Sequence, residues 1–227
     1  AGEIWRAGVE LRDSLGDGWG LEMAEGWAAE LAAIPRLRAG GDGPLARYTT
    51  YKVGGPADAL VWADDDAQAA AILAVAKGHN VPVLPLGRGS NMLVADRGVR
   101  GIVLKLGREF DKVEANGVDV KAGAAVPMSV MSKECAKLGL SGAEFLFGIP
   151  GSMGGGIRMN AGAHGASVAD ITVAARALGW DGATHDVSAA DLAFDYRTSS
   201  LGKYFCGLSG DFRLQPDDPE RVEAKTK

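Results

Sequence analysis

The sequence predicts a mixed α/β (α+β) fold of two subdomains, preceded by a helical N-terminal segment. Three observations predict it. Short apolar runs typical of strands alternate with stretches of helical periodicity. The 33 glycines gather in clusters along the 227 residues instead of spreading evenly. A content of 47% hydrophobic and 23% charged residues is that of a globular protein with a sizeable core.

Residues 1–44 are expected to form a helical extension followed by a linker. Trp27, Leu31 and Ile34 recur at helical spacing, and Pro35 would end that helix. The glycine-rich run at residues 39–44 is typical of a linker. No chemistry is assigned to this part of the chain.

Residues 45–107 are expected to form the first subdomain. A short strand at residues 59–62 precedes three aspartates at 64–66, which suit a helix N-terminus. The following helix should bury one face and end at Gly78; that face holds Ala69, Ile72, Leu73 and Ala76. Further strands are expected at residues 81–86 and 101–106, which gives a β-α-β unit.

Residues 108–215 are expected to form the second subdomain. After a strand that contains Val118 and Val120, Pro127 would begin a helix that Gly139 ends. The inner face of that helix is expected to hold Met128, Met131, Cys135 and Leu138. A later strand starts at Ile171 and Val173 and turns at residues 179–182.

Residues 216–227 are expected to start a further helix. Asp217, Asp218, Pro219 and Glu220 suit a helix N-terminus, and lysines follow near the end of the sequence. The expectation is that this helix leads into another element.

Charge and composition exclude several function classes. A formal net charge of -5 provides no broad basic surface for nucleic-acid phosphates. Cys135 and Cys206 are too few for a disulfide framework, which favours free thiols in a reducing cytoplasm. No apolar run approaches membrane-spanning length, and the three scattered histidines form no recognisable metal motif. We therefore expect a cytoplasmic protein with no metal and no membrane insertion.

Residues 87–91, Gly-Arg-Gly-Ser-Asn, form a glycine-rich turn between apolar runs. Consecutive amides in such a turn can surround an anion, and Ser90 and Asn91 add side-chain donors. The turn matches neither the dinucleotide-binding fingerprint nor a Walker loop. Taken alone, the run is as typical of a structural turn as of a phosphate site.

Residues 148–165 contain seven glycines in eighteen positions. So many glycines would make a poor core element, and close approach of a ligand explains them better than a helix packed tightly on a sheet. A third segment, residues 194–200, places Tyr196 and Arg197 beside three hydroxyl side chains. An arginine suits a carboxylate or enolate because its planar fork stays protonated, although a surface arginine is the simpler interpretation.

The order of these motifs resembles the UDP-N-acetylenolpyruvoylglucosamine reductases, the MurB family. The segment at residues 48–57, Tyr-Thr-Thr-Tyr-Lys-Val-Gly-Gly-Pro-Ala, comes first; the turn at 87–91, the glycine segment at 148–165 and Tyr196-Arg197 follow in order. The match runs from about Leu45 to about Arg213.

The resemblance implies a fold like that of the vanillyl-alcohol-oxidase type, with two subdomains that hold FAD noncovalently. His164 does not act as a covalent anchor in this family. The implied cofactor residues are Tyr51, Lys52 and Val53; Gly87, Arg88, Gly89, Ser90 and Asn91 at the pyrophosphate; Gly123, Ala124 and Ala125 near the adenine; and Pro150, Gly151, Ser152, Gly154, Gly155, Asn160, Ala161, Gly162, Ala163 and Gly165 along the flavin.

The resemblance also implies an activity, the NADPH-dependent reduction of UDP-N-acetylglucosamine enolpyruvate to UDP-N-acetylmuramate in peptidoglycan biosynthesis. Arg197 matches the family's catalytic arginine, and Tyr196 and Arg197 would bind the nucleotide-sugar substrate. The family's proton-donating serine and assisting glutamate belong to a third domain, and no counterpart follows Arg213. Two alternatives stay open: a stand-alone FAD-binding module, and an oxidase or dehydrogenase of the same fold.

Overall fold

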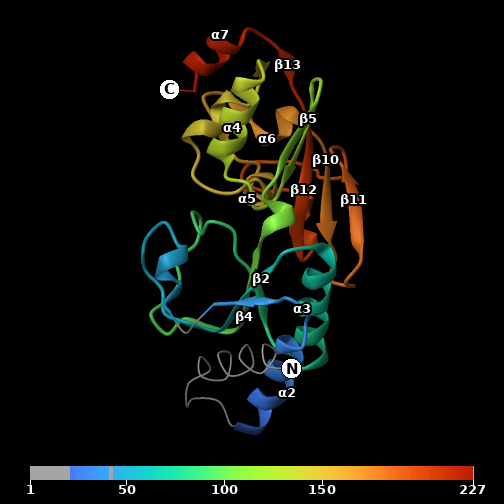
Figure 1. Ribbon diagram of the computed structural model, residues 1–227. Helices are drawn as coiled ribbons and strands as arrows, with labels where there is room; N and C mark the ends of the chain where they lie inside the picture. The colour runs from blue at the N-terminus through green and yellow to red at the C-terminus, as the bar shows by residue number, and fades with distance from the viewer. Residues whose placement is uncertain (1–20, 41–42, 227) are drawn as a thin grey trace. The chain divides into compact units, whose positions relative to one another are not determined.

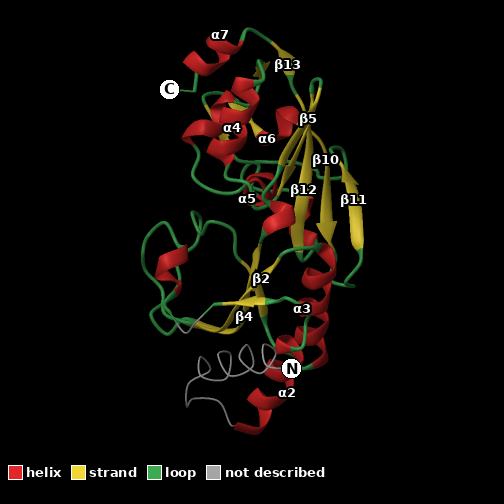
Figure 2. Cartoon of the chain, in the orientation of Figure 1, coloured by secondary structure: helices red, strands yellow, loops and turns green. Residues whose placement is uncertain are grey.

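The computed structural model describes residues 21–40 and 43–226, with side chains from Gly26 onward. These residues form two compact units that divide between Gly107 and Arg108. Each unit has its own sheet, and helices accompany both sheets (Figures 1 and 2). The predicted mixed α/β class is confirmed.

The first unit is built on a four-stranded sheet with the order β1-β2-β4-β3. Strands β2 and β3 run parallel to β4, whereas β1 runs antiparallel to β2. Helix α3 connects β2 to β3, as the predicted β-α-β unit requires. The elements are α2 (Leu21–Ala32), β1 (Arg38–Ala39), η1 (Leu45–Tyr48), β2 (Ala57–Ala63), α3 (Asp66–Gly78), β3 (Val83–Pro85) and β4 (Val99–Leu106).

Helix α3 follows the sequence pattern closely. Asp65 is its N-cap and accepts a hydrogen bond from the Gln68 amide at 2.8 Å. The predicted inner face is buried: Ala69, Ile72, Leu73 and Ala76. The expected stop is displaced, because Gly78 is still helical and the left-handed residue is Asn80, with φ of 54°. Asparagine tolerates this conformation better than most side chains.

The residues expected to form a linker include part of the first sheet. Ala39 pairs with Val61 in β1, and the Gly40 amide donates to the Leu60 carbonyl at 2.7 Å. Trp27, Leu31 and Ile34 are buried, as their spacing predicts. The described part of the N-terminal segment therefore belongs structurally to the first unit.

The second unit is built on a five-stranded antiparallel sheet with the order β11-β10-β12-β6-β5. Helices α4, α5 and α6 contribute to the buried core on one face of this sheet (Figure 2). The elements are η2 (Arg108–Phe110), β5 (Val113–Asn116), β6 (Asp119–Gly123), α4 (Met128–Lys137), β7 (Leu140–Ser141), η3 (Glu144–Gly148), α5 (Met153–Arg158), β8 (Gly162–Ala163), β9 (Ala166–Ser167), α6 (Val168–Ile171), β10 (Thr172–Leu178), β11 (Thr184–Ser188), η4 (Ser200–Lys203), β12 (Cys206–Arg213), β13 (Gln215–Pro216) and α7 (Pro219–Ala224).

Helix α4 buries three of the four residues predicted for its inner face. Met128, Met131 and Cys135 lie in the core, but the prediction for Leu138 is wrong, since 57% of that residue is exposed. Leu138 is the C-cap and no longer continues the helical face. Burial, together with the nearby Glu134 and Glu144 carboxylates, raises the pKa of the Cys135 thiol to about 12, so this cysteine stays protonated and unreactive.

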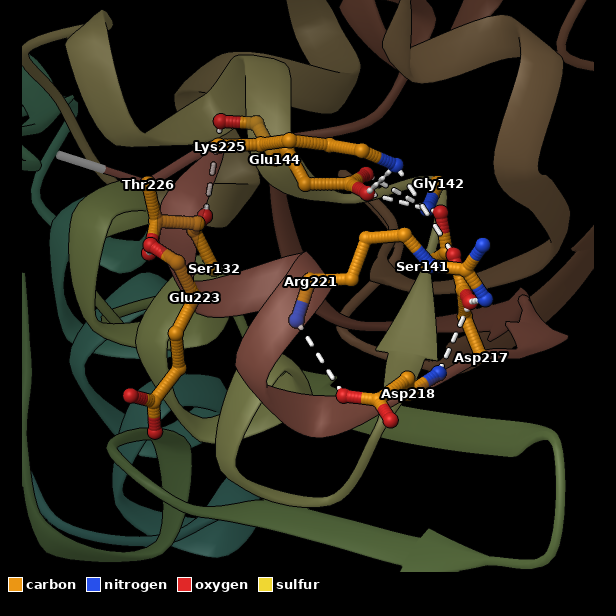
Figure 3. A network of polar contacts seen from close by, with 10 residues as sticks. All are labelled: Ser132, Ser141, Gly142, Glu144, Asp217, Asp218, Arg221, Glu223, Lys225 and Thr226. Atoms are coloured by element: carbon orange, nitrogen blue, oxygen red, sulfur yellow. Dashed lines mark hydrogen bonds and ion pairs between the residues drawn. The ribbon is translucent and has the colours of Figure 1, made fainter.

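Helix α7 is held to the second unit by a polar network around Glu144 (Figure 3). The Glu144 carboxylate accepts hydrogen bonds from Ser141 Oγ at 2.7 Å, the Gly142 amide at 2.6 Å and Lys225 Nζ at 3.3 Å. Burial raises the pKa of Glu144, but these bonds outweigh that effect and lower it below its ordinary value. Asp218 caps α7, as predicted.

Candidate functional site

Two of the predicted cofactor segments lie side by side in the first unit. The Thr50 amide donates to the Gly89 carbonyl at 3.1 Å, which joins the turn at residues 48–53 to the turn at residues 87–91. Tyr51 and Val53 are large exposed side chains, at 63% and 41%, and Lys52 adopts a left-handed backbone with φ of 56°. Residues separated by more than thirty positions thus form one surface.

Gly89 is required at this junction for packing. Its φ is +63°, and an added Cβ would lie 2.8 Å from Thr49 Cα and even closer to the Tyr48 carbonyl oxygen. Backbone atoms occupy this space, so a side chain at this position would overlap them. From the sequence alone this run was as typical of a structural turn as of a phosphate site, and contact within the chain already explains the glycine.

Two other predicted segments adjoin in the second unit, around the N-terminus of α5. The Gly154 amide donates to the Ala124 carbonyl at 3.0 Å, and the Met153 amide donates to the Val126 carbonyl at 2.8 Å. An added Cβ on Gly154 would lie 2.8 Å from Ala124 Cβ. Residues 123–125 and 150–155 are therefore joined through their backbones; Gly123, Ala124 and residues 151–153 are buried, whereas Pro150 and Gly155 are exposed.

Gly155 differs from Gly154, because packing within the chain does not explain it. It is exposed in α5, and an added Cβ would meet only Ser152 Oγ, at 3.8 Å. A glycine inside a helix costs about 0.5–1 kcal/mol relative to alanine. A residue that is unfavourable for the helix and has open space beside it fits a surface that a ligand approaches closely. This is the observation on which the fit of FAD to the second unit rests.

Gly155→Ala is expected to separate binding from stability. The variant should unfold at a slightly higher temperature, because alanine favours the helix, yet bind FAD about 5–150-fold more weakly, since an inserted methyl group typically costs about 1–3 kcal/mol. Thermal unfolding of the apo-protein and titration of flavin fluorescence measure the two effects.

Gly78→Ala is the matched control for this variant. Gly78 is also helical, and no described atom lies within 4 Å of its added Cβ. FAD affinity should therefore stay unchanged in Gly78→Ala. Equal FAD affinity of Gly155→Ala and the unaltered chain would remove Gly155 from the site.

Tyr196 and Arg197 form the tip of a tight turn in the second unit. The Asp195 and Thr198 backbones bond to each other in both directions, at 3.1 and 3.3 Å, and the Tyr196 amide donates to Asp195 Oδ1 at 2.6 Å. Tyr196 is 87% exposed, and the exposed Arg197 has φ of 54°. The turn therefore presents both side chains outward from a fixed backbone.

Asn160 joins this turn to the glycine-rich segment. Its Nδ2 donates to the Asp195 carbonyl at 3.2 Å, and its Oδ1 accepts from the Ala169 amide at 3.0 Å. Ser199 Oγ makes a second connection by donating to the Arg158 carbonyl at 3.1 Å. The structure therefore brings the glycine-rich segment and the Tyr196-Arg197 turn together, and the Asn160 side chain links that turn to the backbone of α6. The neighbouring residues Ala161, Gly162, Ala163 and Gly165 lie on or beside the β8–β9 hairpin.

Left-handed backbone is concentrated in the predicted site segments. Among the described non-glycine residues with positive φ, Lys52, Asn160, His164 and Arg197 lie in those segments; the others are Arg36, Asn80 and Ala193. Such conformations cost of order 1 kcal/mol or more each and cluster at functional sites. Their distribution supports a site at these segments independently of glycine content.

Sequence reasoning missed two residues beside the predicted segments. Lys105 Nζ donates to the Gly87 carbonyl at 2.6 Å. Ser209 pairs with Gly123 across the sheet, and its buried Oγ has no hydrogen-bond partner among the described residues. A lysine at the end of an apolar strand was a usable signal for the first, whereas a serine in a strand gave none.

The described residues contain no cluster of histidine, cysteine, aspartate and glutamate side chains that could hold a metal ion. In the same part of the chain, no helix combines the length and apolar character needed to cross a membrane.

Comparisons with known proteins place the chain in a family. A family described as FAD binding domain matches residues 57–188. UDP-N-acetylenolpyruvoylglucosamine reductase of Paracoccus denitrificans is 45% identical over 181 residues, which cover 80% of this chain and 58% of that protein. The enzyme of the same name from Phenylobacterium zucineum is 42% identical over 202 residues, which cover 88% of this chain and 67% of that protein.

Solved structures agree in fold. The MurB reductase of Thermus caldophilus has a TM-score of 0.69 and 33% identity, covering 84% of this chain and 66% of that one. A chitooligosaccharide oxidase, with a TM-score of 0.65 and 15% identity over 84% of this chain and 43% of that one, shares the fold alone. The chain spans about three fifths of the length of several curated relatives that it matches, at 58–61%. Within that span, the matched FAD binding domain and the shared reductase sequence show that the chain belongs to the UDP-N-acetylenolpyruvoylglucosamine reductase family of flavoproteins.

Proposed function

We propose that this chain holds noncovalent FAD in a cytoplasmic enzyme that uses NADPH to reduce UDP-N-acetylglucosamine enolpyruvate to UDP-N-acetylmuramate. Bound FAD would supply the hydride-transfer chemistry. The observation that supports the proposal most directly is the outward turn carrying Tyr196 and Arg197, tied through Asn160 to the glycine-rich segment. A flavin surface and a substrate-facing cation thus share one local framework in the second unit.

Arg197 is proposed to stabilise negative charge on the substrate. Reduction of an enolpyruvyl group places developing charge on an enolate beside a carboxylate, and a fixed guanidinium lowers the energy of that charge. The backbone bonds between Asp195 and Thr198 fix the Arg197 Cα, so only side-chain rotation remains to be set by the substrate. Tyr196, at the same tip, is proposed as a substrate contact.

The proposed cofactor contacts divide between the units. In the first unit, residues 51–53 and 87–91 would contact FAD, with the pyrophosphate at the second of these segments. In the second unit, residues 123–125 and 150–165 would contact the remainder through the backbone, because many of these residues carry no side chain or a single methyl group. Ser90 and Asn91 would add side-chain donors.

The test is flavin retention followed by turnover. Purified chain is expected to be yellow and to release unmodified FAD on acid or heat treatment. Its turnover of the enolpyruvyl substrate is expected to be at least about 10²-fold below that of the Phenylobacterium zucineum enzyme, because the matched residues cover 67% of that protein and a missing general acid typically costs about 10²–10⁴ in rate. Stopped-flow absorbance of bound FAD, with NADPH and then substrate, measures both steps.

Three outcomes separate the candidate functions. If the purified protein is colourless and also fails to bind added FAD, this would falsify the cofactor assignment. Turnover close to that of the relative would show that the proton donor lies within these 227 residues. Bound FAD that NADPH does not reduce, with substrate affinity also absent, would favour a stand-alone FAD-binding module.

A further inference from the structure

Lys105 lies directly behind the turn proposed to hold the FAD pyrophosphate. It is near the end of β4, half-buried, and paired in register with Trp62 of β2. Its Nζ lies 5.5 Å from the centroid of the Tyr48 ring. The stem of the side chain is therefore covered while the ammonium reaches the turn at residues 87–91.

The ammonium group binds two successive carbonyl groups, that of Leu86 just before the turn and that of Gly87 in it. Lys105 Nζ donates to the Gly87 carbonyl at 2.6 Å and to the Leu86 carbonyl at 3.4 Å. The Leu86 amide in turn donates to the Leu104 carbonyl at 2.7 Å. The start of the turn is thus attached to β4 through both its backbone and the lysine.

These two bonds fix the direction of two amides. The described residues contain no cis peptide bond, and in a trans peptide the N–H points away from the carbonyl of the same peptide unit. With the Leu86 and Gly87 carbonyls facing Lys105, the Gly87 and Arg88 amides face away from it. In the described part of the chain, neither amide donates to another backbone carbonyl. Successive amides on one side form a concave anion site.

The charges around Lys105 also favour an anion on the outer side of the turn. Burial, with a smaller contribution from the Arg88 guanidinium, lowers the pKa of Lys105 to about 8. The groups near the ammonium in the described part of the chain include the Arg88 guanidinium, from the turn, and the Tyr48 phenol ring, from η1. An anion on the outer side of the turn would reduce the repulsion between these two cations.

We propose that Lys105 is the positioning residue of the pyrophosphate-binding turn: it holds the Leu86 and Gly87 carbonyls on the β4 side and so directs the Gly87 and Arg88 amides to the pyrophosphate of FAD. This rests on the proposed function. Lys105 touches the turn and not the ligand, so its effect on FAD passes through the backbone.

The experiment compares Lys105→Met and Lys105→Arg with the unaltered chain. Methionine keeps the stem and removes every donor, whereas arginine keeps charge and donors. FAD fluorescence quenching is expected to show Lys105→Met binding about 10–100-fold more weakly, the size expected for lost hydrogen bonds to a charged group. Lys105→Arg should recover most of that loss. ADP, which carries the pyrophosphate, should weaken in parallel with FAD, and riboflavin, which lacks it, should not.

Lys133→Met is the matched control. Lys133 Nζ lies 5.2 Å from the centroid of the Phe147 ring, so this lysine also packs on an aromatic side chain, but it belongs to α4 of the second unit and the turn belongs to the first. FAD and ADP affinities should not change in this variant.

The pH dependence of FAD affinity gives a second readout on the unaltered chain. Protonated Lys105 holds the Leu86 and Gly87 carbonyls more strongly than the neutral amine does, so FAD affinity should be constant below pH 8 and fall as the pH rises above it. Lys105→Arg should show no such fall up to pH 9. This pH dependence tests the positioning role of Lys105 even if Lys105→Met does not fold.

The failures are distinguishable. If the unaltered chain does not bind FAD, the proposed function fails. If it binds FAD, and Lys105→Met keeps the same FAD and ADP affinities, the positioning role is wrong and the proposed function stands. Equal weakening of riboflavin would also overturn the proposal, because it would place the effect away from the pyrophosphate. The proposal would also be overturned if the FAD affinity of the unaltered chain, like that of Lys105→Arg, stayed constant up to pH 9.

Discussion

Gly89→Val is expected to remove FAD from the protein and to destabilise the first unit. A β-branched residue at φ of +63° is strained, and its Cβ would overlap the backbone of Tyr48 and Thr49. Strain and overpacking together are expected to cost on the order of 3–5 kcal/mol. The turn can accommodate the side chain only by separating residues 48–53 from residues 87–91. Urea unfolding of the apo-protein and flavin titration measure both effects.

Gly117→Val is the control, because it reproduces the strain without the contact. Gly117 has φ of +60°, and no described atom lies within 4 Å of its added Cβ. The difference in unfolding free energy between the two variants therefore measures packing against residues 48–49. If Gly89→Val is as stable as Gly117→Val and still loses FAD, close approach of the ligand explains the glycine, and packing within the chain does not.

Arg197→Lys is expected to lower kcat for the enolpyruvyl substrate by about 10²–10³, the effect of removing a donor that meets developing charge. A lysine retains the charge but not the planar fork. FAD affinity and thermal stability should change little, because the side chain is exposed and backbone hydrogen bonds between Asp195 and Thr198 close the turn. The measurement is the steady-state rate of NADPH oxidation by the reductase that carries this chain.

Two further variants interpret the Arg197 result. Arg197→Gly relieves the left-handed backbone and removes the side chain, so it should be at least as stable and no more active than Arg197→Lys. Arg213→Lys alters another exposed arginine of the second unit and should leave kcat unchanged. An Arg197→Lys enzyme with normal kcat would leave Arg197 a purely structural role.

Periodicity predicted helices α3 and α4 well, because the spacing of apolar residues determines which face of a helix is buried. Residues 69–76 of α3 and residues 128–135 of α4 illustrate this. The helix ends were less predictable. Gly78 and Leu138 show that the last turn depends on backbone geometry that residue type determines only weakly. Strand β1 has two residues and gave no periodic signal.

The site was predicted as segments, but the reason for each residue was not. Gly89, Gly154 and Gly155 look equivalent in the sequence, yet the first two are packed against backbone or a neighbouring alanine and the third has open space. Glycine content shows that a Cβ is absent and does not show what occupies its place. Lys105 was missed for a related reason, since its partners are backbone carbonyls, which carry no sequence signal.

The hydrogen bonds from Thr50 to Gly89 and from Gly154 to Ala124 have a thermodynamic consequence for ligand capture. Each joins two contact segments within one unit before any ligand is present, so the local backbone is already ordered. Association should then resemble docking to a rigid surface and not coupled folding. The conformational entropy lost on binding would come mainly from exposed side chains such as Arg88 and Tyr51, at about 0.5–1.5 kcal/mol for each one immobilised.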